Sequence, residues 1–190
     1  AFIILHDCGH GSFFRSQKLN YVFVTICGVL TFTAYLRWRH EHAIHHATAG
    51  DLDRRGSGDV PTLTIKEYRA LPWYGKLGYR LLRHPAILFP LLMPLAFIFL
   101  ERVFIGKGGR RELLSVIYTD LALIAIMLIA AQTIGFTAYV MVQLPITIIA
   151  WFTGNIGFHH IHHLSPKIPN YFLEKCFKEN PIFQHVPTLT

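Results

Sequence analysis

Three short histidine clusters constrain this chain more than any other feature of its sequence. They read HDCGH at residues 6–10, HEHAIHH at 40–46 and FHHIHH at 158–163, and they hold ten of the twelve histidines. The chain is 52% hydrophobic and 15% charged, whereas about a quarter of the residues of a soluble domain are charged. Ionisable side chains are costly beside lipid, so their clustering indicates a functional site.

The apolar composition favours a membrane protein with helical spans. Four apolar stretches stand out, at residues 21–38, 86–100, 116–134 and 136–152. The third of these comes closest to the ~20 residues that a spanning helix needs. The net charge of +7 suits basic loops on the cytoplasmic face. No basic and aromatic groove pattern is visible, so no nucleic-acid partner is expected.

The spacing within each cluster brings its histidines together if the segment is helical. The first cluster holds a pair four residues apart, which would share one helical face. The second and third each contain H-x-x-H-H, whose three side chains span roughly 100° of arc on a helix. Each set is therefore predicted to converge on one point. The converging residues are His6, His10, His42, His45, His46, His159, His162 and His163, and those outside the pattern are His40, His84, His160 and His185.

Eight imidazoles point to a shared metal centre, and their number indicates its kind. Imidazole suits iron, zinc, copper and nickel, but eight ligands are too many for one four-coordinate zinc ion. They suit two ions of higher coordination number with open positions for an exogenous ligand. The chain contains no E-x-x-H, which argues against a carboxylate-bridged di-iron bundle. It contains no H-E-x-x-H, which argues against a zincin protease.

Other residues beside the clusters are candidates for supporting roles. Asp7 and Glu41 could accept the second ring N–H of a ligand histidine, with solvated loop charges as the alternative. Asn155 could share a helical face with the third cluster, or cap the start of that helix. Trp38 and Trp73 are expected to anchor the chain at the membrane interface.

The clusters can meet on one side of the membrane only if an even number of crossings separates them. Residues 21–38 are therefore expected to form a re-entrant or interfacial helix rather than a simple span. Residues 86–100 are too short to cross, and the loop after them is basic and so expected on the cytoplasmic side. The stretches 116–134 and 136–152, separated by Gly135, are expected to form the crossing hairpin.

Three segments resemble the histidine boxes of the membrane fatty acid desaturases. They are HDCGHGSFF, WRHEHAIHHATAGDLDRRGSGD and GNIGFHHIHHLSPKIPNY, and they are most similar to those of bacterial enzymes of the Δ12/ω-6 type. The similarity covers nearly the whole chain, so residues 1–190 are expected to form a single, partial desaturase-like domain.

The resemblance implies an all-α integral membrane protein, expected in the bacterial inner membrane with its histidine boxes on the cytoplasmic side. It implies an oxidoreductase with two non-haem iron ions, bound by the eight converging histidines, and no catalytic residue beyond them. Such an enzyme uses O2 to introduce a cis double bond into a fatty acyl lipid or acyl-CoA. Its electrons come from ferredoxin or a cytochrome b5-like donor. Attack on an unactivated methylene requires such a cofactor, since side chains lack this chemistry.

The chain departs from the family pattern in one region. Family members usually carry a Q-H-x-F-E-like segment before the third box, whereas here Ala150 is followed directly by Trp151. The chain also opens within an apolar helix, which we interpret as truncation. Two alternatives therefore stay open. One is a related histidine-box hydroxylase, acetylenase or ketolase, and the other is a non-catalytic metal-binding remnant of a desaturase.

Overall fold

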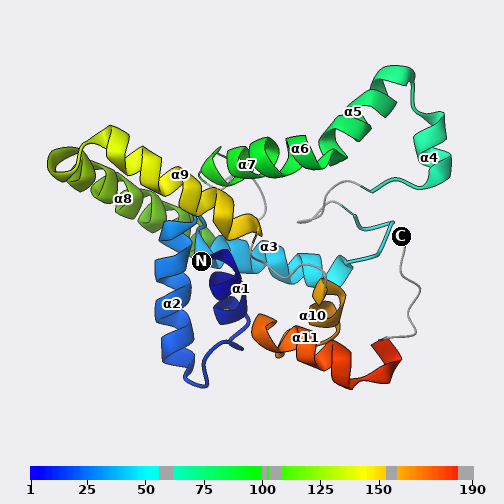
Figure 1. The fold of residues 1–190 in the computed structure, drawn as a ribbon, viewed down its shortest axis with the longest axis horizontal. Helices are drawn as coiled ribbons and strands as arrows, with labels where there is room; N and C mark the ends of the chain where they lie inside the picture. Colours follow the sequence, from blue (N-terminus) through cyan, green and yellow to red (C-terminus); the bar gives the residue numbers. More distant parts are fainter. Residues whose placement is uncertain (56–61, 100–101, 103–107, 153–157, 184–190) are drawn as a thin grey trace.

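Helices make up the regular structure of the protein, as the all-α prediction requires. The computed structural model describes residues 1–55, 62–99, 102, 108–152 and 158–183, and these contain no strand. The helices run from one end of the chain to the other as Figure 1 shows. They are α1 (Phe2–Gly9), α2 (Gln17–Leu30), α3 (Tyr35–Thr48), α4 (Ile65–Ala70), α5 (Trp73–Arg83), α6 (Pro85–Ile87), the π-helix η1 (Leu88–Leu92), α7 (Met93–Phe99), α8 (Arg110–Thr133), α9 (Phe136–Phe152), α10 (His159–Leu164), α11 (Asn170–Glu179) and the 3-10 helix η4 (Pro181–Phe183).

A small apolar core holds α1 against α2 and the start of α3. Asn20, which is buried, closes the loop between α1 and α2. Its side-chain oxygen accepts from the Phe14 N–H at 2.9 Å, and its amide nitrogen donates to the Phe14 carbonyl at 2.8 Å. This packing fixes the first histidine cluster beside the second. The buried core residues are Leu5, Cys8, Val24, Cys27 and Trp38.

The apolar stretch 21–38 is bent, as the crossing argument requires. Helices α2 and α3 meet at 99°. The Thr31 hydroxyl donates back to the Cys27 carbonyl at 2.8 Å, a contact that ends or bends helices. Phe32 then takes a φ of 57°, in the left-handed region that residues other than glycine rarely adopt. This geometry agrees with the expectation that the stretch is not one straight span.

Helices α8 and α9 form a hairpin and lie side by side in Figure 1. At 24 residues, α8 is about 36 Å long, which exceeds the ~30 Å of a bilayer's hydrocarbon core. Only 22% of its apolar window is buried, unlike the core helix of a soluble protein. Gly135, with a φ of 85°, forms the turn. Among the described residues, α8 alone is long and apolar enough to cross a membrane unbroken, and the 17-residue α9 carries Pro145.

The stretch 86–100 is broken into short segments. It begins with α6, continues as η1, which contains Pro90, and ends with α7, which contains Pro94. Together these helices span 85–99, about 22 Å of rise, which is less than the hydrocarbon core. This length agrees with the expectation that the stretch does not cross the membrane. Leu100, its last residue, lies outside the described residues.

Arg102 links the α2–α3 corner to the apolar helix α8. Its guanidinium pairs with the Asp120 carboxylate at 2.9 Å and also donates to the Phe32 carbonyl. A carboxylate on a membrane helix is costly unless it is paired, so this contact accounts for the acidic residue inside the apolar run of α8.

Gly28 determines how closely α2 approaches the corner. A Cβ there would lie 2.7 Å from the Thr33 carbonyl oxygen, a backbone atom that has little freedom to move. We expect Gly28→Ala to lower the free energy of unfolding by about 1–3 kcal/mol through overpacking. The measurement is the thermal unfolding midpoint in detergent micelles.

Gly78→Ala on α5 is the matched control. No atom lies within 4 Å of the position that a Cβ would take at this residue. The helix-propensity gain of up to about 1 kcal/mol should therefore leave the midpoint unchanged or raised. Equal midpoints for the two variants would contradict the proposed close approach.

Candidate metal centre

The structure brings together all eight histidines that the sequence singles out. They come from the α1 end, from α3 and from α10, which gather in Figure 1 although they are far apart in sequence. The eight histidines form two groups. Within each group, the ring nitrogens that could bind a metal ion lie within 4.8 Å of one another. The five-histidine group is His6, His10, His42, His46 and His162, and the three-histidine group is His45, His159 and His163.

The division into two groups corrects the prediction that each H-x-x-H-H motif converges on one point. On α3, His42 and His46 join one group, whereas His45 joins the other. On α10, His159 and His163 share a group, whereas His162 joins the opposite one. Residues four apart on a helix lie nearly above each other, but adjacent residues diverge by about 100°. Each motif therefore serves both groups.

The five-histidine group has more converging nitrogens than hydrogen bonds can satisfy. The Nε2 atom of His42 lies 3.0 Å from that of His10 and 3.1 Å from that of His46. The Nε2 atom of His46 lies in turn 3.2 Å from that of His162. A neutral ring nitrogen carries either one hydrogen or one lone pair. Three consecutive contacts among four such atoms cannot all be well-aligned hydrogen bonds, whereas one central cation could accept every lone pair.

The spacing of these nitrogens fits a metal ion of high coordination number. With metal–nitrogen distances of about 2.1 Å, neighbouring ligands lie about 3.0 Å apart in an octahedron and about 3.4 Å apart in a tetrahedron. The three measured contacts, 3.0–3.2 Å, are closer to the octahedral value. The Nε2 atom of His6 is buried and has no hydrogen-bond partner among the described residues, as a ligand nitrogen would be.

The three-histidine group lies directly beside the first. The His163 ring is 4.8 Å from that of His45 and 4.6 Å from that of His159, measured between centroids. The same ring is 4.4 Å from that of His46, which belongs to the five-histidine group. The arrangement therefore provides two adjacent sites. Among the described residues, the three-histidine site has fewer nitrogen donors than the five-histidine site.

Burial keeps five of the eight rings neutral at physiological pH. It lowers the pKa of His10 to about 3, that of His46 to about 4, that of His159 to about 4 and that of His162 to about 2, with neighbouring histidines adding to the effect. The pKa of His42 is lowered as well, for the same reasons. A metal ion binds the neutral ring, so no proton has to be displaced at pH 7.

Asp7 occupies the position expected of a residue that orients a ligand. Its carboxylate is buried, and one oxygen lies 3.1 Å from Nδ1 of His6. The other oxygen accepts the backbone N–H of Asn170, at the start of α11, at 2.5 Å. A proton on Nδ1 directed at the carboxylate leaves Nε2 of His6 free for a metal ion. Asp7 thus joins the first cluster to the chain that follows the third.

The other two supporting candidates have different outcomes. Glu41 does not contact a histidine in the described structure. Its carboxylate, which is 42% exposed, instead pairs with Arg37 at 3.2 Å. The reason is the i,i+4 spacing on α3, which places the two opposite charges on one helical face. Asn155 lies outside the described residues.

The described histidines outside the pattern join neither group. His40, His84 and His160 are exposed. His84 caps α6 through Nδ1, which accepts from the Ala86 N–H at 3.3 Å. His160 contacts the rings of Phe177 and Phe183, at 6.4 Å in each case. His185 lies outside the described residues.

Trp38 contacts the site, contrary to its predicted role as an interface anchor. It is not an interface anchor, because it is buried and its ring stacks on that of His42 at 4.5 Å with an interplanar angle of 17°. Its other side is so close to α1 that a Cβ on Gly9 would lie 2.6 Å from the indole. The signal was available, since Trp38 lies four residues before His42 on the same helix. Trp73 is exposed, as an interface anchor would be.

A separate cavity of about 240 Å³ lies between α2, α3 and α8. Its lining includes Tyr21, Tyr35 and Ser115 but none of the eight histidines. The cavity is therefore separate from both histidine groups.

The two-group geometry makes the effect of one substitution predictable. His163→Ala removes one of the three donors of the smaller group, whereas the five-histidine group keeps all its ligands. We therefore expect this variant to bind about half as much metal per chain as the unsubstituted protein. The measurement is metal per chain by elemental analysis after loading with ferrous iron. His40→Ala, on the far side of α3, should retain the full amount, and equal losses in both variants would refute the grouping.

The position of Asp7 predicts a loss of metal affinity when its charge is removed. Asp7→Asn cannot accept hydrogen bonds from both His6 and Asn170, since its amide nitrogen only donates. We expect metal affinity to fall about 10–100-fold, as for other residues that orient ligand histidines. Competition with a chelator of known affinity would measure it. Asp51→Asn, whose carboxylate is bonded to Arg54 in a surface loop, should have no effect, and an unchanged affinity in Asp7→Asn would contradict the orienting role.

Comparison with known proteins agrees with the histidine pattern. The sequence model of the fatty acid desaturases matches residues 1–150. A fatty acid desaturase of Bacillus subtilis is 37% identical over all of this chain and 66% of its own length, so the chain spans just under two thirds of that relative. An sn-1 acyl-lipid omega-3 desaturase (ferredoxin) of Synechocystis is 37% identical over 40% of this chain and 21% of its own. No solved structure matches the chain.

Two details of these matches describe how far the chain and its relatives correspond. The alignment with the Bacillus protein covers 235 positions against the 190 residues of this chain, so at least 45 residues of the relative have no counterpart here. The family match ends at residue 150, where the sequence analysis expects the missing segment. Since the match covers most of the chain and the Bacillus relative aligns with all of it, this protein belongs to the fatty acid desaturase family, whose members are membrane-bound.

Proposed function

We propose that the chain is a fatty acyl desaturase domain, spanning residues 1–190, which introduces a cis double bond into an acyl chain. The observation that carries the proposal is the convergence of eight histidines from three segments into two adjacent groups. No carboxylate takes part in either group among the described residues. This all-nitrogen donor set fits two iron ions, and the eight histidines are their proposed ligands.

The proposed reaction balances with O2 and two external electrons. Two hydrogens leave adjacent methylenes, and a double bond forms between the two carbons. With two further protons and two electrons, O2 is reduced to two water molecules. When bound, the two iron ions supply the activation of O2 that side chains cannot provide. The electrons are proposed to come from ferredoxin, which the name of the Synechocystis relative mentions, or from a cytochrome b5-like donor.

The chain's own residues prepare the site for this chemistry. Asp7 holds the Nδ1 proton of His6 and so directs Nε2 into the five-histidine group. Trp38 covers one face of His42 and excludes water from it. Burial keeps the rings of His10 and His159 neutral at pH 7. Each contribution favours metal binding and a dry environment for the acyl chain.

The proposed substrate is a fatty acyl lipid or acyl-CoA in a bacterial inner membrane. Acyl-lipid substrates are named for the Synechocystis relative, and the length of α8 supports a crossing hairpin with α9. The histidine boxes are proposed to face the cytoplasm. Regiochemistry of the Δ12/ω-6 type stays a prediction, because several relatives whose names give a position are omega-3 desaturases.

A non-catalytic metal-binding remnant is the second candidate. The observation that favours it is the shorter chain, since at least 45 residues of the Bacillus relative have no counterpart here. The described residues also give the second group only three histidines. A related hydroxylase or ketolase is the third candidate, because the same metal centre could insert oxygen instead of forming a double bond.

Expression in a bacterial host that lacks polyunsaturated fatty acids would distinguish the three candidates. We expect a new unsaturated fatty acid in the membrane lipids by gas chromatography and mass spectrometry. The product should disappear in His42→Ala, which removes a central ligand, and persist in His40→Ala. A hydroxy or keto product would favour the third candidate, and bound iron without any product would favour the remnant. Zinc alone in protein grown with iron would contradict an O2-dependent oxidase.

A further inference from the structure

Helix α5 has two chemically different faces. At 3.6 residues per turn, two of its three aromatic side chains and two of its three leucines fall within one arc of about 100°, and its cations fall within a neighbouring arc of about 60°. We call the first set the α5 apolar face and the second the α5 basic face. The apolar face consists of Trp73, Tyr74, Leu77 and Leu81, and the basic face consists of Lys76, Arg80 and Arg83.

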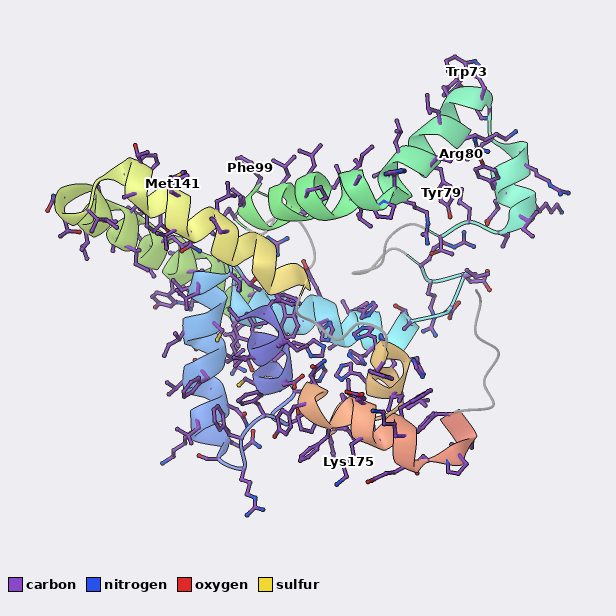
Figure 2. All side chains as sticks on the ribbon, in the orientation of Figure 1. Trp73, Tyr79, Arg80, Phe99, Met141 and Lys175 are labelled. Carbon is purple, nitrogen blue, oxygen red and sulfur yellow. The ribbon has the colours of Figure 1, made fainter. Side chains whose placement is uncertain are left out.

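The basic face is the side of α5 that folds against α4 and the chain before it. Arg80 donates to the Tyr68 hydroxyl at 2.7 Å and lies over the same ring at 5.9 Å. The Tyr79 hydroxyl accepts the backbone N–H of Leu63 at 3.3 Å. Figure 2 shows Tyr79 and Arg80 on the inner side of this bend. These contacts fix the rotation of α5 about its own axis.

That rotation leaves the apolar face outside. Its four side chains are between 46% and 77% exposed, and Trp73 is the most exposed of them. Figure 2 shows Trp73 at the outer edge of the turn between α4 and α5. A solvent-exposed patch of two aromatic rings and two leucines is unusual in a soluble protein. It indicates that another molecule or a membrane covers this face.

The charges around the α5 apolar face indicate the charge of the surface that it binds. Residues 62–83 carry Lys66, Arg69, Lys76, Arg80 and Arg83 but only one acidic residue. That residue, Glu67, is already paired with Arg55 at 3.0 Å. Among the described residues, Lys76 and Arg80 form no ion pair, since the partners of Arg80 are the neutral hydroxyl and ring of Tyr68. The surroundings of α5 are thus strongly positive.

We propose that α5 lies in the membrane–water interface, with its apolar face in the acyl region and its cations among anionic lipid headgroups. An exposed apolar face that carries Trp and Leu, beside a face rich in Lys and Arg, is the pattern of a helix that binds an anionic bilayer surface. Lysine and arginine can extend to the headgroups while their alkyl stems stay on apolar surface. The proposal concerns membrane placement and does not depend on the chemistry proposed above.

The chain that follows α5 supports a bilayer as the occupant. Figure 1 shows α5, α6 and α7 following one another in a row that leads away from the α4–α5 turn. The exposed apolar side chains continue along this row with Leu91, Leu95 and Phe99. A partner protein would have to match this length of apolar surface, whereas a bilayer accepts it without specific complementarity.

Site-specific fluorescence on the full chain in liposomes tests the placement. Leu77→Cys and Lys76→Cys, on the two faces, would each carry a nitrobenzoxadiazole label in a Cys176→Ser background that keeps the buried Cys8 and Cys27. We expect lipids brominated in their acyl chains to quench the label at position 77 at least about twofold more than that at position 76, because only the first lies in the acyl region. Aqueous iodide should show the opposite order.

Equal quenching at both positions would overturn the proposal. So would a label at position 77 that is shielded from both quenchers, because a protein partner or a second copy would then cover the face. An unchanged iron content in the labelled chains would show that the substitutions leave the fold intact.

A lipid comparison tests the anionic part of the proposal. At equal mole fraction, brominated phosphatidylglycerol should quench the label at position 77 more than brominated phosphatidylcholine, and high salt should remove the difference. Lys76→Gln, which leaves the contact of Arg80 with Tyr68 intact, should weaken this preference but keep the quenching by phosphatidylcholine. Equal quenching by the two lipids in the unsubstituted α5 would refute the role of anionic headgroups.

Discussion

The crowding of neutral imidazoles in a buried space is the constraint on which the rest of this structure depends. Four Nε2 atoms approach one another in consecutive contacts of 3.0–3.2 Å, which hydrogen bonds alone cannot satisfy. The surrounding fold must therefore hold the rings in place from outside. It does so with the apolar core of α1 and α2, with Trp38 stacked on His42, and with Asp7 bonded to His6. Metal binding would then supply the stabilisation that the rings cannot give each other.

Helical spacing explains how so few residues can build two sites. In each H-x-x-H-H motif, the outer pair shares one direction and the middle histidine points to the neighbouring group. Two short helices, α3 and α10, therefore each contribute to both groups, and this fixes the groups side by side. A change in the register of either helix would remove ligands from both groups together. Adjacent sites are what a reaction that needs two metal ions requires.

The sequence alone identified the eight histidines, because their spacing is local and helices convert spacing into direction. Their division into two groups was missed, since we treated the arc of each motif as one point instead of following its individual members. Trp38 was missed because a tryptophan in an apolar chain was read as an interface residue, although its i,i+4 relation to His42 was visible. For Glu41 the structure shows the solvated-charge alternative, because Arg37 at the i,i+4 spacing pairs with its carboxylate. The contact of Asp7 with Asn170 joins residues far apart in sequence, and no local pattern could predict it.

That long-range contact also helps to hold the third box at the site. Asp7 accepts the N–H at the start of α11, and the Tyr171 hydroxyl donates to the Phe13 carbonyl at 3.2 Å. Both contacts come from the first box or its loop, and both hold the chain on the C-terminal side of the third box. Helix α10 is thus fixed from α11 rather than only from α9.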